Sequence, residues 1–256
     1  MNYPLFQSER YQQIFAKHQL DGFNQLWNKS IDWFEEPNHR RGGWSGVGKL
    51  LLQTKGDELS IFVKKQQNHG RLTLLHPFKG EPTFRREFKR LRFLETFHIK
   101  APKVVFYGEQ VIDGKACAML ATEALLGFEP LDVVTQNWQK ASQSTRQQKK
   151  RLLATIALSL RGFHQTGLVH RALYPKHIFI KNGGTQPEVA LIDLEKARFS
   201  PFFLYRTYFD LSALNRHAEY WTRSERLFFF LQYFQAKRLN NRLKLIYKLI
   251  LKRSAR

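Results

Sequence analysis

The chain has 256 residues, of which 43% are hydrophobic and 14% aromatic, and this composition excludes an intrinsically disordered protein. Its 42 Lys and Arg residues against 21 Asp and Glu residues leave a formal net charge of +21, which favours a polyanionic partner such as nucleic acid, anionic lipid or a phosphorylated glycan. The single cysteine, Cys117, excludes an intrachain disulfide and a cysteine-based metal cluster, and it is typical of a reducing compartment.

The first 30 or so residues predict short helices with aromatic anchors, without an apolar segment like that of a secretory signal. After them, the sequence RRGGWSGVGK at 40–49 predicts a glycine-rich turn that leads into a strand at 50–54, a hairpin. Glycine lets the backbone approach a ligand closely, and free amides in such a turn can cradle phosphates. Glycine turns are equally common in hairpins that bind nothing, so both interpretations stay open.

The next two elements carry a lysine and a carboxylate. Residues 59–66 predict a strand on which Phe62 and Lys64 share one face. Residues 82–97 predict a helix, with Glu87 on its apolar stripe. A buried carboxylate needs a partner, and spacing leaves two candidates for Glu87: Lys64, or Arg90 on the same helix.

Two further strands are predicted at 101–108 and 116–123, with a turn at Asp113-Gly114. Residues 125–130 would connect two lobes. The stretch 135–150 is polar and rich in glutamine, so we expect a linker or the exposed start of a helix.

Residues 151–164 have the apolar spacing of an amphipathic helix. Behind it, the stretch 168–180 is an apolar run, a polar loop with Pro175 and a second apolar run, and the segment 189–197 repeats this pattern with Asp193 after its apolar run. We expect two short strands that deliver polar groups to one end of a site.

The C-terminal third is predicted to be helical. From Tyr220 to Arg256 it carries ten Lys or Arg residues and one acidic residue, a net +9, while the longest apolar run, 227–231, is too short to span a bilayer. The end of the chain predicts a core helix with a basic outer face or an interfacial helix on anionic lipid, and we favour core packing with an outer face that attracts a membrane.

These motifs, in this order, resemble the protein-kinase fold. In detail they resemble the lipopolysaccharide kinase family (the Kdo and core-heptose kinases) and its InaA-like branch. The resemblance implies an α+β, two-lobed fold: a helical extension at 1–32, a small β-rich N-lobe at 33–124 and a helical C-lobe with the basic tail at 125–256. The motifs that carry it are Arg41-Gly-Gly-Trp-Ser-Gly-Val, Phe-Val-Lys64, Arg-Glu87-Phe, His170-Arg-Ala-Leu-Tyr-Pro-Lys-His177, Asp193-Leu-Glu-Lys and Asp210-Leu-Ser-Ala-Leu.

The resemblance implies ATP and Mg²⁺ as cofactors, and it assigns roles in phosphoryl transfer. Lys64 would hold the nucleotide phosphates, Glu87 would orient Lys64, and Asp193 would bind Mg²⁺. His177 stands where most kinases have an asparagine metal ligand and is implied to belong to the metal site. Imidazole is a poorer ligand for Mg²⁺ than oxygen, so His177 would position a phosphate or a water molecule of the metal's second shell. The residues implied to contact nucleotide are Gly43, Ser45, Gly46, Lys64, Glu123 and Asp193, with Ala124 beside them, and those with a structural role are His170 and Asp210.

One position departs from the kinase pattern, because Ala172 stands where the aspartate base is expected. Losing a positioned base typically slows a reaction by about 10²–10⁴. The leading hypothesis is an ATP-dependent phosphotransferase with an alcohol acceptor, a sugar of the lipopolysaccharide inner core, at the cytoplasmic face of the inner membrane. The alternative is a non-catalytic protein that binds nucleotide or an anionic glycolipid. Nucleic-acid binding rests on charge alone, since no recognition motif accompanies the basic residues.

Overall fold

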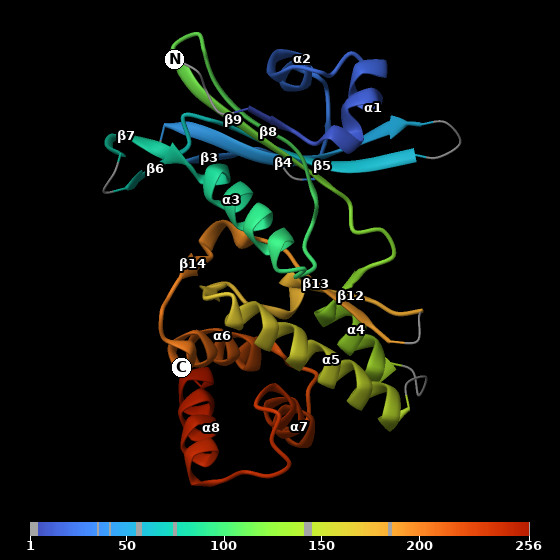
Figure 1. The fold of residues 1–256 in the computed structure, drawn as a ribbon, viewed down its shortest axis with the longest axis vertical. Coiled ribbons are helices and arrows are strands. Elements are labelled where there is room, and N and C mark those ends of the chain that lie inside the picture. The colour runs from blue at the N-terminus through green and yellow to red at the C-terminus, as the bar shows by residue number, and fades with distance from the viewer. Residues whose placement is uncertain are drawn as a thin grey trace. The chain divides into compact units, whose positions relative to one another are not determined.

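The computed structural model describes residues 5–34, 36–40, 42–54, 58–73, 76–140, 145–183 and 186–255 (Figure 1). The chain forms two compact units. The first contains residues 1–92 and 102–125, and the second contains residues 93–101 and 126–256. The boundaries predicted from sequence, at 32 and 124, stay a prediction.

The first unit is built on an antiparallel seven-stranded sheet in the order β1-β8-β9-β5-β4-β2, with β3 also paired to β4. A separate antiparallel pair, β6 with β7, leads into the helix α3. The strands are β1 (Leu5–Gln7), β2 (Asp32–Trp33), β3 (Asn38–Arg40), β4 (Gly43–Gln53), β5 (Glu58–Gln67), β6 (Gly70–Thr73), β7 (His76–Pro82), β8 (Val104–Ile112) and β9 (Lys115–Glu123).

The sheet has a helical layer on each face. A 3-10 turn at Glu9–Tyr11 and the helices α1 (Gln12–Lys17) and α2 (Phe23–Asn28) lie on one face, and α3 (Thr83–Thr96) lies on the other (Figure 1). The main core forms beneath the first layer, where Phe15 and Leu26 are completely buried against Ile61 and Val63 of β5. Because strand side chains alternate, Phe62 and Lys64 face the α3 side.

The second unit is mostly helical. It has a three-stranded sheet in the order β10-β12-β13, a two-stranded pair of β11 with β14, and 3-10 turns at Pro175–His177 and Leu194–Lys196. The strands are β10 (Glu129–Pro130), β11 (Leu168–Val169), β12 (Ile178–Lys181), β13 (Glu188–Leu191) and β14 (Arg198–Phe199), and the helices are α4 (Leu131–Lys140), α5 (Arg146–Gln165), α6 (Phe203–His217), α7 (Arg223–Tyr233) and α8 (Asn241–Ser254).

Most predicted elements are present, with shifted ends. The lysine strand 59–66 is β5, the helix 82–97 is α3, and the turn at Asp113-Gly114 is present, with both residues at positive φ. Within the glycine-rich hairpin, strand β4 begins at Gly43, and Arg41 lies outside the described residues. The polar stretch 135–150 contains the end of α4 and the start of α5, while 141–144 lie outside the described residues.

The C-terminal helix α8 packs on α6 through Leu243 and Ile250, which are buried, and Ser254 donates to the carbonyl of Ser212. Its other face is exposed, with Leu245 60% and Leu249 45% accessible. The prediction of core packing on one face is therefore confirmed. None of the helices in the described part of the chain has the length and apolar character needed to cross a membrane.

Lys65, on strand β5, caps the C-terminal end of helix α2 with its side chain. Its Nζ donates to the carbonyls of Trp27 and Lys29, at 2.8 Å each, and so satisfies acceptors that the end of a helix leaves free. The residue is only 4% exposed. Burial lowers the pKa of Lys65 to about 8.

Replacing Lys65 with methionine is expected to remove a pH dependence of stability. The folded-state pKa of about 8 lies below the usual lysine value of about 10.4, so the unfolded chain binds more protons between these two values. The free energy of unfolding of the wild-type protein, relative to that of the variant, should therefore rise with pH across this window. Urea unfolding below and above the window measures this difference. Parallel pH profiles would contradict it, and the exposed Lys103→Met is the matched control.

Candidate functional site

In the first unit, Lys64 and Glu87 form a bidentate ion pair. Lys64 lies on β5 and Glu87 on α3, and Nζ of Lys64 donates to both carboxylate oxygens at 2.7 Å. The Glu87 side chain is 5% exposed and that of Lys64 is 21% exposed. Of the two predicted partners for Glu87, the structure shows Lys64. The pair leaves a lysine ammonium fixed in position on the α3 side of the sheet.

A second ion pair fixes helix α3 against the sheet. The guanidinium of Arg85 donates to both carboxylate oxygens of Glu109 on β8, with Nε of Arg85 2.6 Å from Oε1, and the Tyr107 hydroxyl also donates to Glu109. The ring of Phe88 stacks on that of Tyr107 at 4.3 Å. The Glu109 carboxylate raises the pKa of Arg85, and burial raises the pKa of Tyr107. These contacts hold the helix that carries Glu87.

Gly43 and Gly46 of the glycine-rich segment lie close to neighbouring atoms. A Cβ on Gly46 would lie 2.6 Å from the Trp33 ring, and one on Gly43 would lie 2.2 Å from the backbone oxygen of Gln67. Close packing therefore accounts for both glycines. Ser45 precedes Gly46 on the strand, and its side chain faces the Lys64 side of the sheet. The nucleotide contacts predicted for Gly43, Ser45 and Gly46 stay a prediction.

Glu123, at the end of β9, is tied to the N-terminal layer. Its carboxylate accepts a hydrogen bond from the Tyr11 hydroxyl at 2.8 Å. The backbone amide of Glu123 donates to the carbonyl of Lys103, and that of Ala124 donates to the carbonyl of Ser60. These two amides therefore cannot donate to a ligand without breaking bonds. The predicted contact with adenine stays a prediction.

In the second unit, Asp210 holds the loop that follows β11. Its Oδ2 accepts from the amide of His170 at 2.6 Å, and its Oδ1 accepts from the amide of Arg171 at 2.9 Å. Arg171 has φ of 68°, a left-handed backbone conformation that is strained for a residue other than glycine. The completely buried carboxylate thus keeps the loop in a conformation that it would not adopt alone.

The Asp210 carboxylate also belongs to a buried hydrogen-bond network. Its Oδ2 lies 3.0 Å from Nε2 of His164 on α5, and Nδ1 of His164 lies 2.7 Å from the Tyr233 hydroxyl on α7. That hydroxyl also lies 2.8 Å from Oγ1 of Thr207. Every one of these side chains is inaccessible to solvent. This network connects α5, α6 and α7 to the loop that follows β11.

His170 braces the turn that carries Asp193. Burial lowers the pKa of His170, so its ring is neutral near pH 7, and Nε2 donates to the carbonyl of Ile192 at 2.9 Å. The amide of Ile192 in turn donates to the carbonyl of His177. These bonds bring the end of β13 against the loop. Asp193 follows with φ of 58° and ψ of 58°, a second strained residue in the same place.

His177 and Asp193 face each other. Nδ1 of His177 donates to the carbonyl of Ala172 at 2.7 Å, which leaves the lone pair on Nε2 in the neutral ring. That Nε2 lies 3.5 Å from Oδ2 of Asp193. The Asp193 side chain is 35% exposed, so a ligand can reach it from solvent.

Ala172, at the position of the expected base, is 1% exposed. Its carbonyl accepts from Nδ1 of His177 and from the amide of Tyr174. The carbonyl of Ala172 is therefore bonded twice, but the residue offers no proton acceptor in its side chain. Arg171 lies beside it, with its guanidinium 5.8 Å from the Phe209 ring and its Nε buried without a hydrogen bond.

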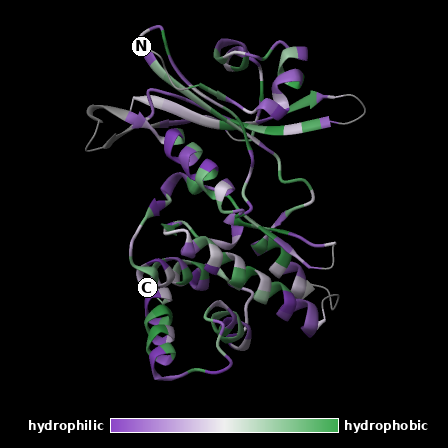
Figure 2. Cartoon of the chain, in the orientation of Figure 1, coloured by the Kyte–Doolittle hydropathy of each residue, from purple (hydrophilic) through white to green (hydrophobic). Residues whose placement is uncertain are grey.

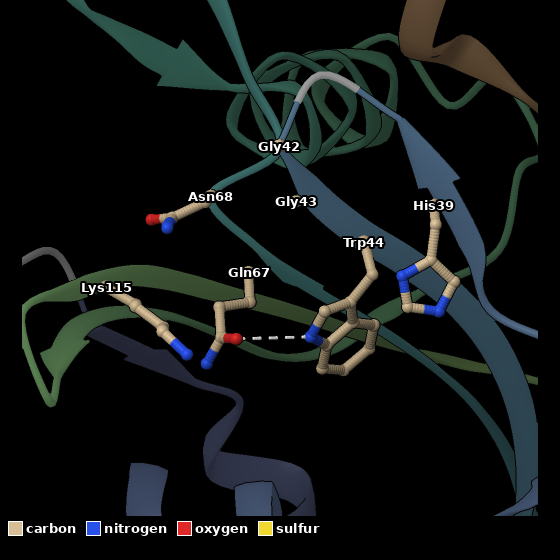
Figure 3. Close-up of a pocket in the computed structure, with 7 residues that line it drawn as sticks. All are labelled: His39, Gly42, Gly43, Trp44, Gln67, Asn68 and Lys115. Carbon is tan, nitrogen blue, oxygen red and sulfur yellow. Dashed lines mark hydrogen bonds between the residues drawn. The ribbon is translucent and has the colours of Figure 1, made fainter.

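A shallow hollow of about 360 Å³ lies on the other face of the first sheet (Figure 3). Trp44 and Gln67 are paired residues of β4 and β5, and Nε1 of Trp44 donates to the side-chain oxygen Oε1 of Gln67 at 3.3 Å. Gln67 is three residues from Lys64 and so faces the opposite side of the strand. The hollow is therefore separate from the ion pair of Lys64. Its lining residues are His39, Gly42, Gly43, Trp44, Gln67, Asn68 and Lys115.

Comparisons with known proteins agree with this geometry. The sequence model of the lipopolysaccharide kinase (Kdo/WaaP) family matches residues 24–233. The chain belongs to this family. Protein InaA of Escherichia coli (strain K12) is 35% identical over 187 residues, which make up 72% of this chain and 82% of that relative. A solved structure described as WaaP in complex with acyl carrier protein has a TM-score of 0.71 at 20% identity and covers 98% of both chains, which shows a shared fold.

The family and the kinase-like α+β fold that the motifs predicted are thus confirmed. The structure brings Lys64 to Glu87 in the first unit, and His170, His177 and Asp193 together with Asp210 in the second. Sequence reasoning missed His164. The available signal was its position beside Phe163 on the apolar helix, which predicts that the imidazole is buried. A buried imidazole needs a hydrogen-bond partner.

Proposed function

We propose that this member of the lipopolysaccharide kinase family is an ATP-dependent phosphotransferase whose acceptor is a hydroxyl of a lipopolysaccharide inner-core sugar. The observation that carries the proposal is the bidentate pair of Lys64 with Glu87, because a buried carboxylate that holds one ammonium in place fits a phosphate-binding role. Phosphoryl transfer depends mainly on alignment and charge neutralisation, which such a fixed cation provides.

Asp193 is proposed to hold Mg²⁺. Mg²⁺ is usually held by one or two carboxylates together with substrate phosphates and water, and the partly exposed carboxylate of Asp193 fits that donor set. The described residues contain no group of three or more His, Cys, Asp or Glu side chains arranged for a metal, so the phosphates and water would complete the coordination. When bound, the ion would neutralise charge on the transferred phosphoryl group.

His177 is proposed to orient Asp193 rather than to bind the ion directly. Imidazole nitrogen is a poorer ligand for Mg²⁺ than oxygen is. The hydrogen bond from Nδ1 of His177 to the carbonyl of Ala172 fixes the ring, and Nε2 then faces Oδ2 of Asp193. A protonated Nε2 would donate to the carboxylate, and a water molecule of the ion's shell would donate to a neutral one.

The acceptor is proposed to be an anionic glycolipid, encountered at the cytoplasmic face of the inner membrane. The net charge of +21 supports this proposal, because a basic protein concentrates near anionic lipid and near phosphorylated core sugars. Membership of a family of lipopolysaccharide kinases supports the same substrate class.

A second candidate function rests on Ala172. The kinase pattern has an aspartate there, and this chain has a buried methyl group. A protein that binds nucleotide or an anionic glycolipid without transferring phosphate would keep Lys64, Glu87 and Asp193 but would have no need of a base. The two candidates differ on turnover.

Binding of ATP with Mg²⁺ is expected to raise the melting temperature of the wild-type protein and not that of Lys64→Ala or Asp193→Ala. A ligand at 100 times its dissociation constant stabilises the folded state by about 2.7 kcal/mol. For a chain of this size, each 1 kcal/mol corresponds to about 2–4 °C. Thermal unfolding with and without millimolar MgATP measures the shift.

Lys103→Ala, an exposed lysine of the same unit, is the matched control and should shift like the wild type. A shift that survives in both site variants would contradict this site, and no shift in the wild type would contradict nucleotide binding. Turnover is then measured as phosphate transfer from ATP to purified core glycolipid. Transfer no greater than that of Asp193→Ala would leave the non-catalytic candidate.

A further inference from the structure

The segment that follows Asp193 exposes an unusual amount of apolar surface. Four of the seven residues at 199–205 are large, apolar or aromatic, and accessible to solvent: Phe199 is 51% exposed, Phe202 72%, Leu204 42% and Tyr205 36%. Phe97, which is 50% exposed, continues this surface through Phe93, whose ring lies 4.8 Å from that of Phe97 and 5.0 Å from that of Phe199. Soluble monomers rarely expose such a patch without a partner.

The backbone displays these side chains in a fixed arrangement. Phe199 is paired with Leu168 in the β11–β14 ladder, and the amide of Ser200 donates to the carbonyl of Gly167 at 2.9 Å. The buried guanidinium of Arg206 donates to the carbonyl of Ser200. The amide of Tyr205 donates to the carbonyl of Phe202, where α6 begins. Phe202 is therefore exposed on a turn whose backbone is fixed by hydrogen bonds.

Cations border this apolar surface. Lys196 and Arg198 are both exposed, and Arg198 also donates to the Tyr205 hydroxyl at 3.3 Å. No acidic residue occurs from 196 to 209, and Asp210, the next one, is completely buried. Residues 196–209 thus combine aromatic side chains with positive charge and include no acidic residue.

We infer that residues 196–205, here named the docking segment, insert into the interface of an anionic lipid bilayer. Aromatic and leucine side chains gain free energy in the headgroup region, and each nearby lysine or arginine adds attraction to anionic lipid. An electroneutral bilayer would supply the first contribution but not the second. The docking segment therefore prefers bilayers that carry negative charge.

The inference deepens the proposed function and rests on it in one respect. The docking segment begins three residues after Asp193, in the same unit. If Asp193 takes part in phosphate transfer, docking holds the transfer machinery at the membrane surface, where a lipid-anchored sugar acceptor is presented. Binding to the bilayer itself needs neither nucleotide nor acceptor, so it can be measured separately.

Helix α8 offers the competing surface. It exposes Leu245 and Leu249 among the exposed residues Lys244, Lys248 and Lys252, and Figure 2 shows hydrophobic and hydrophilic residues side by side along this helix. The docking segment is favoured because its apolar part is mainly aromatic and because the chain leads directly from it to Asp193. The experiment therefore compares the two surfaces.

The test is binding of the full-length protein to large unilamellar vesicles, measured by co-sedimentation. Vesicles of phosphatidylcholine with about a quarter phosphatidylglycerol are compared with pure phosphatidylcholine, and binding to the anionic vesicles should weaken as salt is added. The double variant Phe202→Ser with Leu204→Ser should bind the anionic vesicles at least about tenfold more weakly than the wild type. Leu245→Ser with Leu249→Ser, the matched control on α8, should change binding less than about twofold.

Both variants alter exposed side chains, so an unchanged melting temperature verifies that they fold. Wild-type-like vesicle binding by the docking variant, loss of binding by the α8 variant alone, or equal binding of the wild type to neutral and anionic vesicles would each overturn the inference. The vesicles contain no glycolipid and no ATP. A failed MgATP shift would therefore count against the proposed function and leave this result unaffected.

Discussion

Replacing Asp210 with alanine is expected to lower the free energy of unfolding by about 3–5 kcal/mol, the range for breaking a buried charged network. The carboxylate is completely buried and accepts from the amides of His170 and Arg171 and from His164. Its loss leaves buried donors without acceptors, and each such group costs about 1–3 kcal/mol. The strained backbone of Arg171 also loses the bond that holds it. Urea unfolding measures the change.

Glu219→Ala removes an exposed carboxylate from the same unit and is the matched control for the change in net charge. It should change the free energy of unfolding by less than about 0.5 kcal/mol. Asp210→Asn should fall between the two, because its amide nitrogen must face one of the donors that the carboxylate now accepts. A loss in Asp210→Ala no larger than that of the control would show that the loop is held by other contacts.

The order of the motifs was sufficient to predict the family and the fold. The sequence from His170 to His177, the turn at Asp193 and the later Asp210 have a fixed order and spacing along the chain, and the elements between them have clear apolar periods. Tertiary packing did not change the local structure that these patterns predict. The positions of β5, α3 and the turn at Asp113-Gly114 were predictable for the same reason.

Partners distant in sequence were less predictable. Spacing could not choose between Arg90 and Lys64 for Glu87, because Lys64 is 23 residues away and only the packing of α3 on the sheet brings it close. The partners of His164 lie 46 and 69 residues further along the chain. Strand β1 has three residues and pairs with β8 near residue 107, so no local period indicates it.

One boundary was left open, between a linker and the exposed start of a helix, although its signal is local. Helix α5 begins at Arg146, five residues before the apolar spacing begins at 151, because Thr145 and Gln148 form a capping box. The Thr-x-x-Gln pattern is visible in the sequence. The polar composition of the stretch concealed it, since a helix start without apolar residues has no hydrophobic period to detect.

Replacing Ala172 with aspartate is expected to raise phosphate transfer by about 10²-fold or more, the lower end of what a positioned base contributes. The new carboxylate would occupy a position that is 1% exposed, so burial would raise its pKa. A base acts in its deprotonated form, and the gain should therefore grow with pH. The same burial should lower the free energy of unfolding, by a few kcal/mol if the carboxylate finds no hydrogen bond. Initial rates across pH, with purified core glycolipid as acceptor, measure the gain.

Ala172→Asn is the matched control, because asparagine has nearly the size and polarity of aspartate but cannot accept a proton at neutral pH. It should share the loss of stability and show no gain in rate. Gain in the aspartate variant alone would mean that the site retains every group for transfer except the base. Equal rates in the wild type and both variants, above that of Asp193→Ala, would mean that transfer proceeds without a base at this position. Because a loose transition state places little demand on proton removal, alignment by Lys64 and Asp193 would then be sufficient for the reaction.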